Sequence, residues 1–91
     1  MLHPHHHHLG DFVGAVWIEV GIVGERLVLS WEGVGRIMHQ SLLAILISQG
    51  LEESTRHIMQ LDDGYSLSLS HSSHGIRIIA MCLQYLAMGS I

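Results

Sequence analysis

Histidine is the residue whose number and spacing in this chain most clearly suggest chemistry. Five of the nine histidines lie within the opening segment Met1-Leu2-His3-Pro4-His5-His6-His7-His8. Neutral imidazole nitrogens are common ligands of zinc, nickel and copper ions. The pattern therefore predicts that the N-terminal segment binds a transition metal.

The histidine at the third position defines a more specific site within this segment. A free amine at Met1, two deprotonated backbone amides and the imidazole of His3 can complete a square plane around Cu(II) or Ni(II). We expect Met1 to remain, because its removal generally requires a small second residue and here that residue is Leu2. Further imidazoles, which also suit Zn(II), come from His5, His6, His7 and His8.

A second interpretation of the same segment involves no biological metal. A low-complexity histidine tail, natural or artificially added, binds metal in the test tube as any oligohistidine does. The interrupted start His3-Pro4 differs from a standard hexahistidine tag, so both interpretations stay open. In either case residues 1–10 are predicted to form a flexible tail, and residues 11–91 a single domain.

The remaining histidines do not form a recognisable site. His71 and His74 have the spacing of half a zinc site, but no second cluster supplies the other ligands, and a turn at the end of a strand explains them better. His39 and His57 are predicted to face solvent or to make a local hydrogen bond, for His57 with Glu53.

No catalytic pattern occurs in the chain. Cys82 lies in the apolar run Ile78–Leu83, which indicates a buried structural thiol. The pair Gly33 and Gly35 lacks the third glycine of a dinucleotide-binding loop, and a P-loop is excluded because there is no lysine. No Gly-x-Ser-x-Gly motif is present. We therefore predict that the protein is not an enzyme.

Composition favours contact with another protein surface over nucleic acid. The formal net charge is −4 and the only strong bases are four arginines, so no basic stripe can follow a phosphate backbone. The apolar share is high at 48% and the charged share low at 13%. These values predict apolar surface that a protein partner or a second copy covers, or else poor solubility.

Membrane spanning and secretion are not indicated. The longest stretches without a charged residue, 37–51 and 78–91, are shorter than the about 18 apolar residues of a spanning helix. Association with a membrane surface stays open. A signal peptide needs an uninterrupted apolar stretch, whereas Glu19 interrupts the apolar run 12–23. The single cysteine gives no sign of an oxidising compartment, so an intracellular location is favoured.

The clearest structural signal is a β-hairpin at Val23-Gly24-Glu25-Arg26. Glycine at the first central position of a two-residue loop suits a type II′ turn. Pairing Val23 with Arg26 places Ile22 opposite Leu27, Val20 opposite Leu29 and Ile18 opposite Trp31, which makes one face wholly apolar. A shift by one residue would mix the two faces, so the apolar pattern and the turn predict the same register.

The rest of the chain predicts an α+β domain. Residues 36–49 are predicted to be a helix ended by Gly50, although their apolar run also fits a buried strand. A helix over 51–61, a turn at Asp62-Asp63-Gly64, a strand from Tyr65 that ends by Ser73-His74-Gly75, and a largely buried helix over 76–88 follow. The expected order is hairpin, helix, helix, strand, helix.

These features lead to one functional hypothesis with two alternatives. The favoured hypothesis is a small noncatalytic interaction or assembly module with a metal-binding histidine tail. One alternative is a metal-handling protein that carries Cu(II), Ni(II) or Zn(II) on its tail, with no other cofactor required. The other is a reading frame without selected activity, since lysine and asparagine are absent and residues 66–70 alternate serine and leucine as a repetitive nucleotide tract would encode.

Overall fold

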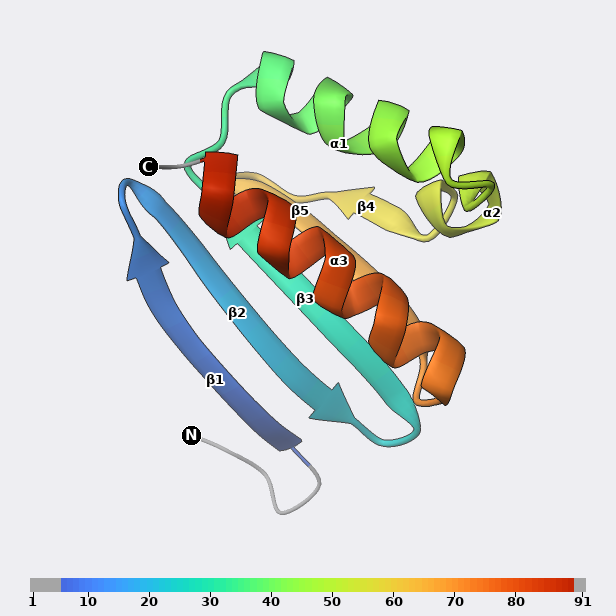
Figure 1. The fold of residues 1–91 in the computed structure, drawn as a ribbon. Helices are drawn as coiled ribbons and strands as arrows, with labels where there is room; N and C mark the ends of the chain where they lie inside the picture. Colours follow the sequence, from blue (N-terminus) through green and yellow to red (C-terminus); the bar gives the residue numbers. More distant parts are fainter. Residues whose placement is uncertain (1–5, 90–91) are drawn as a thin grey trace.

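A five-stranded antiparallel sheet forms the body of the computed structural model, which describes residues 6–89. The strands are β1 (His6–Val13), β2 (Val16–Val23), β3 (Arg26–Glu32), β4 (Ile58–Gln60) and β5 (Gly64–Ser70), in the spatial order β1-β2-β3-β5-β4. The helices are α1 (Arg36–Ser48), the short α2 (Glu52–Thr55) and α3 (Ser73–Gly89). Helices α1 and α3 lie on the same side of the sheet, and β1 forms its outer edge (Figure 1). The predicted α+β class is confirmed.

The hairpin between β2 and β3 is the one predicted from the sequence. Its turn has Gly24 at φ +61°, and no described residue other than glycine has a positive φ, so the two central residues have the signs of a type II′ turn. The observed partners are Val23↔Arg26, Ile22↔Leu27, Val20↔Leu29 and Ile18↔Trp31. The predicted register is confirmed.

The predicted order of elements is wrong at the N-terminus. Residues 6–10, which the sequence pattern assigned to the tail, belong to β1, which pairs with β2 from His6↔Val23 to Val13↔Val16. The connecting turn has Gly14 at φ +63° as its first central residue, followed by Ala15. This is the turn chemistry of Gly24 repeated ten residues earlier, and it extends the hairpin to three strands.

Helix α1 settles the choice that the sequence left open between a helix and a buried strand. Its C-terminus is closed by Gly50 at φ +75°, whose N–H donates to Ile47 O (3.0 Å), while Leu51 N–H donates to Leu46 O (2.8 Å). These two bonds form a Schellman motif, in which glycine relieves the strain of a left-handed conformation. The predicted stop at Gly50 is confirmed.

The predicted helix over 51–61 is wrong beyond its first turn. Only Glu52–Thr55 is helical, and Ile58–Gln60 forms β4, in which Ile58 pairs with Leu67 and packs against the core. The pattern of charges four residues apart was misleading, because such pairs contribute only about 0.2–0.5 kcal/mol each. Burial of Ile58 on the edge of the sheet outweighs them.

Helix α3 begins earlier than predicted, at Ser73 rather than Ile76. The Ser72 hydroxyl accepts a hydrogen bond from Gly75 N–H (3.1 Å), which caps the first turn. A Cβ at position 75 would collide with the carbonyl oxygen of Ser70, so glycine allows the helix to begin directly beside the end of β5. Burial of α3 is limited to one face, since Ile76 is 48% and Met88 66% exposed.

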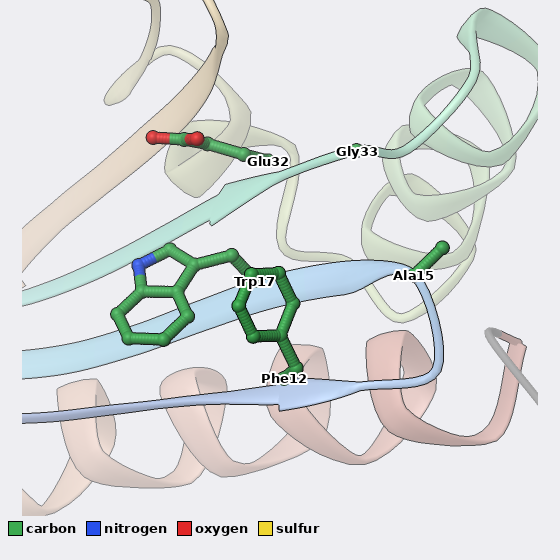
Figure 2. A pocket seen from close by; sticks show the side chains of 5 residues that line it. All are labelled: Phe12, Ala15, Trp17, Glu32 and Gly33. Atoms are coloured by element: carbon green, nitrogen blue, oxygen red, sulfur yellow. The ribbon is translucent and has the colours of Figure 1, made fainter.

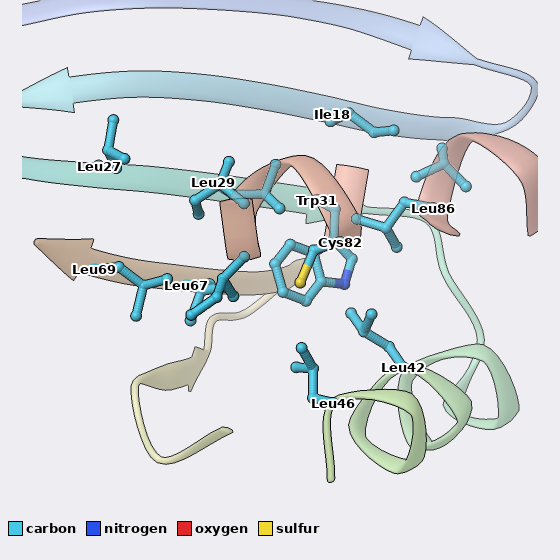
Figure 3. Packing of buried hydrophobic residues seen from close by; sticks show 13 residues of the cluster. Ile18, Leu27, Leu29, Trp31, Leu42, Leu46, Leu67, Leu69, Cys82 and Leu86 are labelled. Carbon is cyan, nitrogen blue, oxygen red and sulfur yellow. The ribbon is translucent and has the colours of Figure 1, made fainter. Parts of the chain in front are cut away.

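The hydrophobic core lies between the sheet and the two long helices (Figure 3). Leu29, Trp31 and Leu67 contribute fully buried side chains from the sheet, and Leu46 and Cys82 do so from α1 and α3. The other buried apolar residues of this core are Val16, Ile18, Leu27, Leu42, Leu69, Ile78, Ile79 and Leu86. The opposite face of the sheet is not covered by a helix (Figure 1), and there Ser30 bonds to Ser66 (3.4 Å) and Arg26 to Ser68.

Adjacent residues of α1 provide a test of this packing. Leu46→Ala should lower the free energy of unfolding by about 2–5 kcal/mol, because Leu46 is fully buried and its truncation leaves a cavity. Ile47→Ala is the matched control, since Ile47 is 52% exposed on the same turn and should cost much less. Urea unfolding followed by tryptophan fluorescence measures both, and equal losses would contradict the placement of α1.

Candidate functional site

The histidine segment that the sequence singled out is only partly described by the structure. Met1, His3 and His5 lie outside the described residues, and His6, His7 and His8 form the first residues of β1. Within residues 6–89, no group of three or more histidine, cysteine, aspartate or glutamate residues is placed to hold a metal ion. The predicted metal site at the N-terminus stays a prediction.

Two other histidines come from separate segments of the chain and line the same hollow. His57 follows α2 and His74 lies in the first turn of α3, and both line a hollow of about 340 Å³. His57 Nε2 lies 3.8 Å from Oε1 of Glu53, its predicted partner, which is too far for the predicted hydrogen bond, and Glu53 pairs with Arg56 at 3.2 Å. The position of His74 could not be predicted from the sequence, because it depends on how the start of α3 packs beside the segment that follows α2.

His39 is held in a less ordinary environment than predicted. Its ring stacks on Tyr65 of β5 with centroids 3.7 Å apart and an interplanar angle of 8°, and Tyr65 also stacks on Trp31 at 5.9 Å. His39 Nδ1 and Trp31 Nε1 are buried and find no hydrogen-bond partner among the described residues. Burial lowers the pKa of His39, because removal of water disfavours the charged imidazole. His39 therefore packs α1 against the sheet through a neutral imidazole ring.

Cys82 is the buried structural thiol that the sequence predicted. It is fully buried in the core, and burial raises its pKa to about 11. A thiol must be ionised to act as a nucleophile, so Cys82 remains an inert apolar side chain at neutral pH.

The outer edge of β1 is the largest unpaired stretch of backbone among the described residues. In the β1–β2 hairpin, Val13 and Val16 flank a two-residue turn and therefore form a hydrogen-bonded pair. Hydrogen-bonded pairs recur at every second residue, so Leu9 and Asp11 also bond to β2, whereas Gly10 and Phe12 direct their N–H and C=O groups outward. Phe12 N–H accordingly bonds to the side chain of Asp11 (Oδ1, 2.8 Å) instead of to β2.

The face of β1 and β2 on the side of the helices is incompletely covered. Leu9 pairs with Val20 and so lies on the same face as Ile18 and the core residues of β3. Leu9 is nevertheless 84% exposed, and Val20 and Ile22 are half-buried. Helix α3 extends over the middle of the sheet and leaves β1 uncovered (Figure 1). We call Leu9, Val13, Val20 and Ile22, together with the free edge of β1, the β1 flank.

Aromatic side chains occupy the opposite face of the same two strands. Phe12 and Trp17 meet edge to face with centroids 5.0 Å apart (Figure 2). The Trp17 ring lies over Gly10, where a Cβ would collide with it, and its indole N–H donates to Glu19 Oε1 (3.3 Å). With Ala15, Glu32 and Gly33 these rings line an open hollow of about 370 Å³. No catalytic pair of side chains lies in it.

Comparison with known proteins gives no external guide to function. No protein-family model, curated protein or solved structure matches the chain. Within residues 6–89, no helix has the length and apolar character needed to cross a membrane. The β1 flank is therefore the candidate site, because it combines unpaired backbone with exposed apolar side chains.

The environment of His39 predicts a specific dependence of stability on pH. In the unfolded chain the imidazole of His39 has a pKa of about 6.5, so it takes up a proton at a higher pH than it does in the folded protein. The stability contributed by neutral His39 is complete above that value and is lost as the pH falls towards the lowered folded pKa. His39→Phe keeps a ring on Tyr65 and should lose this part of the slope.

The measurement is the free energy of unfolding in urea at several pH values between 7.5 and 5. His71→Gln serves as the control, because His71 is exposed and its replacement should leave the contribution of His39 in place. Identical slopes for the wild-type protein and His39→Phe would contradict the assignment.

Proposed function

We propose that this chain is a small noncatalytic interaction or assembly module whose docking surface is the β1 flank. The observation that carries the proposal is the 84% exposure of Leu9 on a face of the sheet that is elsewhere the core. An apolar side chain in that position is stabilised when another surface covers it.

The distribution of exposed apolar residues supports this location. Leu9 is the most exposed large apolar side chain among the described residues and lies on β1 beside unpaired backbone, whereas the exposed Ile37 and Ile47 lie on α1 and the exposed Ile76 and Met88 on α3. Exposed apolar residues are normal on a protein surface, but an exposed apolar residue beside an unpaired strand edge is typical of a docking surface. The low share of charged residues, 13%, agrees with a surface that is partly covered in the assembled state.

Metal binding by the N-terminal segment is the second part of the proposal. The amine of Met1 and the imidazole of His3 would hold Cu(II) or Ni(II), and His5, His6, His7 and His8 would add ligands for these ions or for Zn(II). This segment continues directly into β1, so a metal ion coordinated there would be held on the same chain, next in sequence to the docking surface. As a metal-handling protein, the chain would use the domain as a carrier for this tail.

The exposure of the β1 flank is tested with an apolar fluorescent dye at low protein concentration. We expect the wild-type protein to bind the dye and Leu9→Ser to bind it several-fold less. Ile37→Ser is the matched control, because Ile37 is 81% exposed but isolated on α1, and it should leave dye binding unchanged. A monomer that binds no dye would remove the basis of the proposal.

A chain without cooperative unfolding in these samples would favour the alternative that the reading frame has no selected activity. Cooperative unfolding combined with dye binding at the β1 flank would count against that alternative.

The metal site is tested by titration with one equivalent of Cu(II), followed by visible absorption and electron paramagnetic resonance. We expect a square-planar spectrum that is lost in His3→Ala, since the imidazole of His3 completes the plane. His74→Ala is the control and should keep the spectrum, because His74 lies in α3. Unchanged affinity and spectrum in His3→Ala would rule out the amine-terminal site.

A further inference from the structure

Strand β1 has a free edge that is complementary to itself. We propose that two copies of this chain pair β1 with β1, antiparallel about a two-fold axis, so that their two five-stranded sheets become continuous. This inference rests on the proposed assembly function and names its partner as a second copy of the chain. A two-fold interface uses the same surface on both copies, which is what a single free strand offers.

The hydrogen-bonding pattern of β1 determines which residues can pair. Positions 6, 8, 10 and 12 direct backbone groups away from β2, because positions 7, 9, 11 and 13 bond to it. An antiparallel partner must therefore match even positions with even positions. In the isolated chain one of the free donors, Phe12 N–H, is occupied only by the neighbouring Asp11 carboxylate, which can be displaced by a strand.

Among the registers that satisfy this rule, one centred on Leu9 fits the side chains best. It places Leu9 opposite Leu9 of the other copy, position 8 opposite Gly10, and position 6 opposite Phe12. Asp11 then lies opposite position 7, a histidine, whereas a register centred on Asp11 would oppose two carboxylates and be destabilised. The two Leu9 side chains meet on the side of the helices, between the two pairs of Asp11 with position 7, so the two β1 flanks lie next to each other.

The other edge of the sheet shows why the partner is β1 rather than β4. Strand β4 has three residues, against eight in β1, so it offers a much shorter ladder for head-to-tail pairing. Strand β1 also lacks the features that keep edge strands apart, since residues 6–13 contain no lysine or proline and Asp11 is their only charged residue. Pairing of β1 with itself closes a dimer and leaves no long edge for further growth.

Cysteine cross-linking tests both the pairing and its register. In the proposed dimer the two Leu9 Cα atoms form a non-hydrogen-bonded pair about 4.5 Å apart, within the about 4.4–6.8 Å of a disulfide. Leu9→Cys should therefore form a covalent dimer under mild oxidation, about tenfold or more faster than Asp11→Cys. The two Asp11 positions would be about 13 Å apart, and native Cys82 is buried and does not compete. Equal rates for the two variants would overturn the register.

Substitutions of Leu9 by residues of opposite charge distinguish specific pairing from loss of folding. Leu9 is exposed in the single chain, so Leu9→Lys and Leu9→Glu should fold but remain monomers of 10.1 kDa in light scattering where the wild-type protein is a dimer. An equimolar mixture should restore the dimer, because opposite charges then face each other. Met59→Lys, at an exposed apolar residue of β4, is the control and should dimerise normally.

The remaining outcomes separate this inference from the proposed function. A wild-type monomer that binds the apolar dye overturns pairing with a second copy but leaves the interaction module standing. An oligomer unaffected by Leu9→Lys overturns the use of β1 but leaves assembly standing. A monomer that binds no dye overturns both.

Discussion

The alternation of β3 between apolar and polar residues is the constraint on which the rest of the structure depends. Leu27, Leu29 and Trp31 face the helices and are at most 6% exposed, whereas Ser30 faces the open side of the sheet. Because β3 is the middle strand, its register with β2 and with β5 decides which residues of both neighbours enter the core. A shift by one residue on either side would exchange an apolar face for a polar one.

A second constraint is how much of the sheet the two long helices can cover. Helices α1 and α3 come from segments that are apolar enough to be buried, yet together they cover the region from β3 to β5 and leave β1 without a cover (Figure 1). Strand β1 is stable at the edge because each of its residues from His6 to Val13 has a partner in β2. The same arrangement leaves Leu9 exposed, so the feature that completes the sheet also creates the surface on which the functional proposals rest. Burial also keeps the Cys82 thiol protonated at neutral pH.

The attachment of α1 shows that this small core includes polar groups at a cost. His39 contributes its ring to a stack with Tyr65, and Tyr65 continues the stack to Trp31. Two ring nitrogens in this stack are buried without a partner among the described residues, and each such group costs about 1–3 kcal/mol. Stacking and burial of ring surface must exceed that cost for α1 to remain in place.

The sequence alone determined the elements whose signals are local. The β2–β3 turn at Gly24, the register that follows from the apolar alternation, the end of α1 at Gly50 and the burial of Cys82 were all predictable, because each depends on neighbouring residues or on an apolar run. The turn at Gly14 has the same local signal, but the histidine run before it is typical of a flexible tail, and so the sequence did not predict β1. Tertiary structure decided the rest: Ile58 leaves a helical pattern because the sheet edge buries it, His39 stacks on Tyr65 because α1 returns over β5, and neither α1 nor α3 extends over β1. These outcomes depend on which distant surfaces compete for the same apolar face, and that competition is settled only when the whole chain packs.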